Sequence, residues 1–465
     1  MNTCRNTFTP LTRREMLQHT AAGFGWLAFA ALSNSAANAA DAYVSPLAPK
    51  LPHFAGKAKR VIFLFMQGGP SHLDTFDWKP ELQKSGGKTA SGAGSSKGKS
   101  GVLLAPQFKF SSRGESGLPI SELFPQLSQH ADDLCLLNGM HTSNAAHPQA
   151  TIALHTGSVN FVRPSLGSWV TYGLGSENEN LPGFVTINPV GAGGAQNYGS
   201  SFLPASYQGT RVDLDAGGIL DIRNRHLSKS RQRSQVDLIQ EMNRELVAKN
   251  PGQLELEGVI QSYELAYRMQ SSVPEVLNLK DEKASTLDLY GINDDATSGF
   301  GTQCLMARRL AESGVRFIQV SKGGWDQHRE LKSALKRNCG SIDRPIAGLL
   351  QDLKERDMLK DTLVLWGGEF GRSPQDQANG GDGRRHNNQG YSMWMAGGGV
   401  KGGMRHGATD ELGGVAVQGK LGTHDLHATI LHLLGFDHTK LTYRYAGRDF
   451  RLTDVYGDVA HEIIS

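Results

Sequence analysis

The sequence predicts an α/β protein in which mainly parallel strands are joined by crossover helices. Short, continuous apolar runs, suited to strands that are covered on both faces, recur along the chain. Long polar or helical segments separate these runs, which is the spacing of crossover connections. The expected strands span residues 59–66, 134–137, 184–187, 315–320 and 362–366, and a further apolar run follows at 391–396.

Residues 1–40 resemble a twin-arginine export signal. Arg13-Arg14 precedes an apolar stretch at 21–32, and residues 37–39 form a small-residue cleavage site. The stretch is too short to span a bilayer, although an uncleaved membrane anchor is the alternative interpretation. We expect the twin-arginine export machinery as a partner, no stable membrane span, and a periplasmic or extracellular mature protein that forms one domain over residues 41–465.

The first expected strand leads into a polar loop at residues 67–77. His72 and Asp74 could bind a metal or could cap the next helix and satisfy a turn. Asp77 fits the capping role better. The loop therefore contributes two candidate ligands and one expected cap.

Two segments are expected to lie outside the core of the fold. Residues 85–101 consist almost entirely of Gly, Ser and Lys, so they predict a mobile loop that buries no core. Residues 228–275 carry apolar positions at helical spacing at 230–249 and 256–269, which predicts a helical insertion.

Three histidines follow the strand at residues 134–137. His141, His147 and His155 occur within a span short enough to suggest a functional loop, although each alone is more often structural.

Asp326 and His328 follow the strand at residues 315–320, at its carboxyl end. Their spacing allows a loop to turn both toward one cation, and a hydrogen-bonded pair within the loop is the alternative. Carboxylate and imidazole ligands together suit zinc or manganese better than calcium, which prefers oxygen ligands alone.

The most informative segment begins with the strand at residues 362–366. Glu369 and Arg372 lie just past its carboxyl end, and His386 follows a short loop later. In open α/β sheets this edge is where ligands bind. Arg372 could contact an anion or form a salt bridge to Glu369, three residues before it.

Charge and cysteine content exclude several classes of protein. The formal charge of +3 falls to +1 when the signal removes three arginines and one glutamate, which argues against nucleic acid as a main partner. Cys135, Cys304 and Cys339 remain in the mature chain, too few for a disulfide scaffold.

These residues resemble the alkaline phosphatase and sulfatase superfamily, and within it a secreted, uncharacterised sulfatase-like family with twin-arginine signals. The resemblance covers essentially the whole mature chain. The motifs that carry it are FLFMQGGPSHLDTFD at 63–77, HTG at 155–157, GGWDQH at 323–328, GEFGRSP at 368–374, RRH at 384–386, AGGGVKGG at 396–403 and HDLHATILHLLGFD at 424–437.

The resemblance implies a three-layer sandwich with helices on both faces of a mainly parallel sheet, and a metal centre at the carboxyl edge of that sheet. Asp326 and His328 look like an aspartate–histidine ligand pair, and His386 resembles the histidine before the glycine-rich turn. The chain departs from the superfamily pattern where ligands are expected at three positions, Gln67, Glu369 and Phe370. No Cys-x-Pro-x-Arg motif is present, so a formylglycine-type sulfatase is not expected.

The favoured function is metal-assisted hydrolysis of an anionic phosphate or sulfate ester. Asp326, His328 and His386 would hold the cation, with Glu369 beside or behind them. Arg372 would pair with the anionic oxygens of the substrate. His147 matches the superfamily's nucleophile position, and would shuttle a proton or accept the transferred group. A noncatalytic binding or assembly protein that retains the fold is the alternative.

Overall fold

The computed structural model describes residues 45, 47–90, 101–214, 218, 219, 222, 226–249, 254–377 and 381–465. Residues 46–465 form one compact unit around an eight-stranded sheet. Its strand order is β14-β6-β13-β10-β1-β9-β7-β8. In chain order these strands are β1 (Arg60–Met66), β6 (Leu134–Met140), β7 (Phe184–Ile187), β8 (Thr210–Val212), β9 (Phe317–Lys322), β10 (Thr362–Gly367), β13 (Tyr391–Ala396) and β14 (Met404–His406).

The sheet is mainly parallel, as the sequence predicts. β1 lies between β10 and β9 and is parallel to both, with Val61 opposite Leu363 on one side and Phe317 on the other. Only β13 runs antiparallel to its two neighbours, β10 and β6. The expected strands are all present, although β6 continues to Met140 and β9 begins two residues later than predicted.

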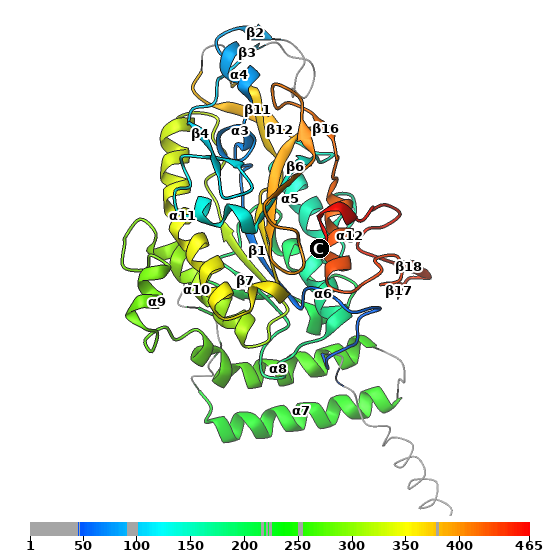
Figure 1. The fold of residues 1–465 in the computed structure, drawn as a ribbon. Helices are drawn as coiled ribbons and strands as arrows, with labels where there is room; N and C mark the ends of the chain where they lie inside the picture. The colour runs from blue at the N-terminus through cyan, green and yellow to red at the C-terminus, as the bar shows by residue number, and fades with distance from the viewer. Residues whose placement is uncertain are drawn as a thin grey trace, which may run out of the picture. The chain divides into compact units, whose positions relative to one another are not determined.

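Helices cover both faces of the sheet (Figure 1). Side chains alternate along β1, so that Ile62 and Leu64 enter one core while Val61 and Phe63 enter the other. The first core is closed by α10 (Ser298–Glu312) and α11 (Leu331–Glu355). The second is closed by α5 (His147–Thr156), α6 (Leu166–Leu174) and α12 (Thr423–Leu433). The protein is therefore a three-layer α/β sandwich.

The predicted helical insertion contains α7 (Lys229–Lys249) and α8 (Leu254–Val276), which pack against each other. The other short helices are α3 (His72–Thr75), α4 (Pro80–Ser85) and α9 (Ala284–Leu289). Small antiparallel pairs complete the fold: β2 (Thr89–Ala90) with β3 (Gly101–Val102), β4 (Phe110–Arg113) with β5 (Leu118–Ser121), β11 (Gly371–Asp376) with β12 (Arg384–Asn387), β15 (Ala408–Thr409) with β16 (Ala416–Gln418), and β17 (Tyr443–Tyr445) with β18 (Arg448–Phe450).

Two predicted segments fall largely outside the described residues. The export signal at residues 1–40 lies wholly outside them, as do residues 91–100 of the predicted Gly/Ser/Lys loop. Among the helices that the structure describes, none is both long enough and apolar enough to cross a bilayer.

The polar loops that follow the central strands all lie at one edge of the sheet. β1, β9 and β10 are mutually parallel, so the loops that follow them emerge at the same edge. β6 has the same direction because it and β10 are both antiparallel to β13. β12 precedes β13 and so reaches the sheet from this edge too. The fold therefore brings five distant segments of the chain to one place.

Candidate metal centre

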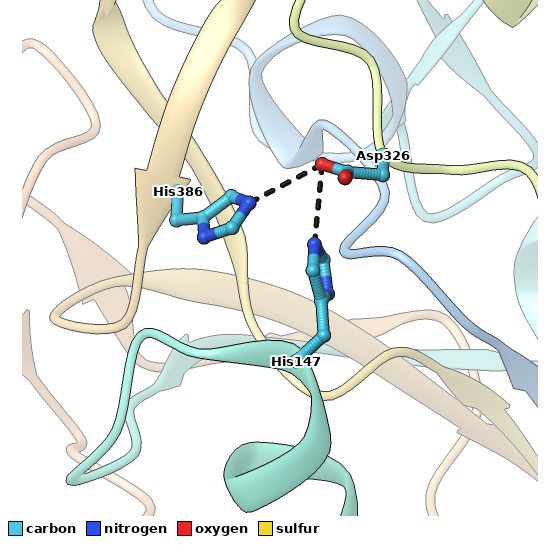
Figure 2. A group of neighbouring side chains, drawn as sticks. All are labelled: His147, Asp326 and His386. Atoms are coloured by element: carbon cyan, nitrogen blue, oxygen red, sulfur yellow. Dashed lines mark hydrogen bonds and ion pairs between the residues drawn. The ribbon is translucent and has the colours of Figure 1, made fainter. Parts of the chain in front are cut away.

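Asp326 lies at the centre of a group of histidines at this edge (Figure 2). Its Oδ1 atom is 3.1 Å from Nε2 of His147, 2.9 Å from Nε2 of His328 and 3.2 Å from Nε2 of His386. The ligand atoms of Asp326, His147 and His386 lie within 4.8 Å of one another. His328, a predicted ligand, lies beside this group and not within it: its Nε2 atom is 2.9 Å from Nε2 of His386.

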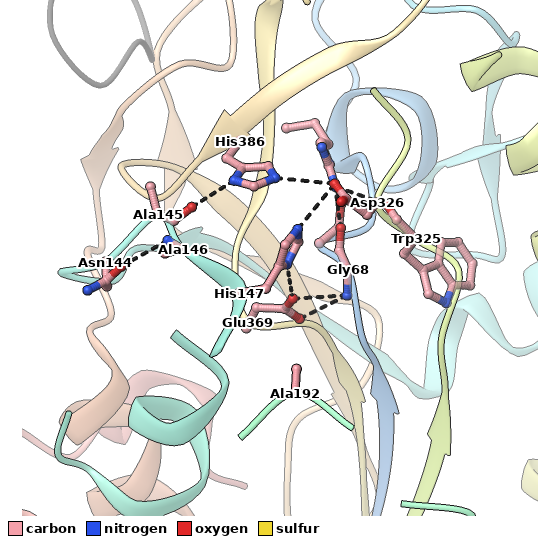
Figure 3. A network of polar contacts seen from close by, with 12 residues as sticks. Gly68, Asn144, Ala145, Ala146, His147, Ala192, Trp325, Asp326, Glu369 and His386 are labelled. Atoms are coloured by element: carbon pink, nitrogen blue, oxygen red, sulfur yellow. Dashed lines mark hydrogen bonds and ion pairs between the residues drawn. The ribbon is translucent and has the colours of Figure 1, made fainter. Parts of the chain in front are cut away.

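The second ring nitrogen of each imidazole, Nδ1, contacts an oxygen atom that can accept a hydrogen bond. The acceptors are the Ala145 carbonyl oxygen, 2.7 Å from His386, the Glu369 carboxylate, 2.5 Å from His147, and the Gln377 side-chain oxygen, 2.9 Å from His328. A carbonyl or carboxylate oxygen accepts, so the Nδ1 atoms of His386 and His147 must carry the protons. Figure 3 shows these contacts for His147 and His386.

With Nδ1 protonated, Nε2 of His147 and of His386 is the nitrogen that can donate a second proton to the Asp326 carboxylate or offer a lone pair to a cation. Acceptor atoms that face one another across 3 Å repel unless a cation or extra protons lie between them. Nε2 of His147 is buried, and the Asp326 Oδ1 atom lies 3.1 Å from it. Metal-bound histidines commonly donate their second nitrogen to a carboxylate or carbonyl. The two imidazoles of His147 and His386 and the Asp326 carboxylate therefore fit a divalent transition metal.

Arg372 contacts the same oxygen of Asp326 as the histidines. Its guanidinium is fully buried and contacts Asp326 Oδ1 at 2.6 Å. Its other N–H groups donate to the carbonyl oxygens of Gly68, Gly69, Trp325 and Arg384. Nη2 faces three of these oxygens, those of Asp326, Gly68 and Trp325, while Nε and Nη1 each donate to one, so Arg372 orients Asp326 and the loop after β1.

The chain approaches itself closely at Gly68. Its backbone N–H donates to both oxygens of Glu369, at 2.9 and 3.2 Å. Gly68 has φ +118°, and a Cβ atom there would lie 2.5 Å from the backbone nitrogen of Asp326. Glycine is required here because only glycine combines that conformation with that contact.

Electrostatics at the site favour positive charge. Burial alone would lower the pKa of His147, but its contacts with Asp326 and Glu369 outweigh burial and raise that pKa to about 9. Burial would likewise raise the pKa of Asp326, but hydrogen bonds from the histidines and Arg372 hold it well below its usual range. The two carboxylates thus create a field that attracts a proton or a metal cation.

The structure brings together all six of the predicted site residues, and it gives two of them, His147 and Arg372, places that differ from those expected. Both ring nitrogens of His147 face carboxylates, so neither is free to attack a substrate. Glu369 lies behind His147, which is one of the two places expected for it. Arg372 forms its ion pair with Asp326, not with Glu369, and its burial removes it from a substrate's oxygens.

Other candidate residues lie outside the cluster. Asp74 pairs with the buried Arg384, and His72 contacts the Gly413 carbonyl. Asp77 accepts a hydrogen bond from Thr409 and pairs with Lys79, so its contacts are structural, but it does not cap α4, whose N-cap position is Lys79. The remaining two histidines, His141 and His155, are likewise absent from the group of possible ligands among the described residues, and His155 is buried against the Thr151 carbonyl.

The sequence did not reveal three of the groups that support the ligands. The backbone of Gly68 and that of Ala145 leave no side-chain signal, although the Gly68-Gly69 pair after a strand marks a close approach. Gln377 comes from a polar stretch in which nothing distinguishes it.

Several solved structures have a similar fold. The lipoteichoic acid synthase LtaP from Listeria monocytogenes matches with 11% identity over 88% of this chain and 78% of its own, with a TM-score of 0.38. The PsFucS1 sulfatase from Pseudoalteromonas sp. matches with 13% identity over 82% and 68%, with a TM-score of 0.36. The alkaline phosphatase from the Antarctic bacterium TAB5 matches with 10% identity over 82% and 99%, with a TM-score of 0.35.

None of the curated proteins matches the chain. A family model does match, and it covers residues 58–464, which include every residue of the cluster described above. The chain therefore belongs to the family described as "protein of unknown function (DUF1501)".

Proposed function

We propose that this protein is an exported, metal-dependent hydrolase of phosphate or sulfate esters. The observation that carries the proposal is the convergence of three Nε2 atoms on Asp326 Oδ1, with the Nδ1 atoms of His147 and His386 committed to oxygen acceptors. Imidazole nitrogens and a carboxylate oxygen aimed at one point form a suitable ligand set for a cation.

The donor set favours zinc or manganese. Imidazole nitrogen is a good ligand for both metals, whereas calcium prefers a shell made of oxygen alone. His147, His386 and Asp326 would hold the cation, with His328 beside them. When bound, it would supply Lewis acidity to polarise an ester oxygen and to lower the pKa of a coordinated water.

The protein's own residues would orient these ligands. Glu369 fixes the ring orientation and the tautomer of His147, and Arg372 fixes Asp326. Water is the nucleophile that best suits this geometry, because both nitrogens of His147 are engaged. In the reaction, the new bond joins the water oxygen to phosphorus or sulfur, the ester oxygen departs, and the proton lost by water ends on the leaving group or in solvent.

Metal analysis of the purified protein tests the first half of this proposal. We expect about one equivalent of zinc or manganese, and thermal stabilisation by that metal. His386→Ala should lose both, while His461→Ala, at an exposed histidine outside the cluster, should keep both. Equal metal binding by the two variants would contradict the assigned ligand set.

Hydrolysis of aryl phosphates and aryl sulfates tests the second half. The metal-loaded protein should release the aryl alcohol, and His386→Ala should not. A protein that binds metal but hydrolyses neither class of ester would instead be a binding protein that retains this fold.

A further inference from the structure

We infer that the site selects a singly charged tetrahedral ester, either a sulfate monoester or a phosphate diester, over a doubly charged phosphate monoester. The inference rests on the metal-dependent function proposed above and adds the class of substrate. It comes from the charges that the cluster holds in direct contact with one another.

Three charged side chains belong to the cluster. Asp326 and Glu369 each contribute one negative charge, and Arg372 contributes one positive charge. The three imidazoles are neutral when a cation occupies the point that their Nε2 atoms face. The protein part of the site therefore has a net charge of one negative unit, and one divalent cation changes it to one positive unit.

The structure provides ligands for one such cation. In the part of the chain that the structure describes, one group of side chains has the geometry of a metal site. The same Asp326 oxygen, Oδ1, also contacts the Arg372 guanidinium, which is held by backbone carbonyls, so a second cation there would lie against a fixed positive charge. Arg384 adds no net charge nearby, because it pairs with Asp74 and both side chains are fully buried.

A singly charged ester neutralises this site, whereas a doubly charged one leaves an excess negative charge beside Asp326 and Glu369. The Glu369 side chain is fully buried, so solvent screens it little, while Asp326 is 46% exposed and is screened more. At the effective dielectric constant of such partly buried sites, one uncompensated charge a few ångströms away corresponds to roughly a tenfold or greater loss of affinity.

Two inert ligands of the same shape and different charge test this inference. Benzenesulfonate is a monoanion, and phenylphosphonate is a dianion at about pH 8.5, above its second ionisation. We expect calorimetry on the zinc-loaded full chain to give a Kd for benzenesulfonate roughly tenfold lower than that for phenylphosphonate. Equal affinities, or tighter binding of phenylphosphonate, would overturn the inference.

Glu369→Gln provides an internal check, because it removes one negative charge with little change of shape. At saturating zinc the variant should shift the ratio of the two dissociation constants toward phenylphosphonate by roughly tenfold. Glu115→Gln, at an exposed position away from the site, should leave the ratio unchanged. An unchanged ratio in Glu369→Gln would show that the site does not select by charge.

Hydrolysis assays then separate the two esters that share this charge. Activity on 4-nitrophenyl sulfate indicates a sulfatase, and activity on bis(4-nitrophenyl) phosphate indicates a diesterase. A preference for 4-nitrophenyl phosphate over both would overturn the inference while leaving the proposed hydrolase intact. A chain that binds neither metal nor anion would overturn both proposals.

Discussion

Replacing Glu369 by glutamine should weaken metal binding without removing a ligand. Glu369 is fully buried, and its Oε1 atom accepts from His147 Nδ1 at 2.5 Å and from the Gly68 N–H at 2.9 Å. Glutamine keeps the shape, but its amide N–H₂ must face one of these two donors, and it carries no charge. The variant therefore disturbs the tautomer that directs the Nε2 lone pair of His147 into the site.

The expected loss of zinc affinity follows from the hydrogen bond between Glu369 and His147. A hydrogen bond to a charged group contributes about 1.5–3 kcal/mol, and each 1.4 kcal/mol is a factor of ten in binding. We therefore expect the Kd for zinc to rise about 10- to 100-fold, the range found when the partner of a metal-bound histidine is removed. The assay is a competition titration against a chromophoric zinc chelator at fixed pH.

The Glu115→Gln variant serves as the control for this titration, since the Glu115 side chain is exposed. If Glu369→Gln binds zinc as tightly as the unmodified protein, then Glu369 does not orient His147 as a ligand and the reasoning fails.

Three further predictions concern stability. Asp74→Asn leaves the buried Arg384 without its counter-charge, so urea denaturation should show a loss of about 3–5 kcal/mol, and a loss below 1 kcal/mol would contradict this. Leu64→Ala opens a cavity in the core beneath α10 and α11 and should cost about 2–5 kcal/mol in the same assay. Burial lowers the pKa of His155 to about 4 and that of His427 to about 3, so both stay neutral in the fold while the unfolded chain protonates below pH 6.5. Stability should therefore fall as the pH drops from 6.5, by about 2 kcal/mol per histidine at pH 5, and His427→Gln should remove about half of this dependence on pH.

The strands at the centre of the fold could be predicted because their signal is local. Residues 61–66 and 363–366 are apolar throughout, since helices cover both faces of the sheet. The edge strands β8 and β14 could not be predicted, because each is three residues long and only partly buried. Their extended conformation comes from pairing with β7 and β6, which is a tertiary effect.

The meeting of Asp326 with His386 could also be predicted, because both follow strands that end at one edge. The hydrogen-bond partners of Arg372 could not be predicted from the sequence. Residues three apart are neighbours on a helix, and that spacing favours a salt bridge to Glu369. Arg372 instead lies in an extended segment, β11, and its side chain contacts Asp326.

The hairpin of β11 and β12 links the stability of the fold to the geometry of the site. Arg372 lies opposite His386 in this pair, and Arg384, two residues before His386, is on the same face of β12. Arg384 is fixed by its buried ion pair with Asp74. A slip of one residue would turn the opposite face of β12 toward the site and would leave both buried charges unpaired. The Arg384–Asp74 ion pair and the position of the His386 imidazole both depend on the register of β12 against β11. The free energy lost when Arg384 is unpaired therefore also keeps His386 at the metal centre. Asp74→Asn should therefore weaken zinc binding as well as the fold, although Asp74 makes no contact with the ligands.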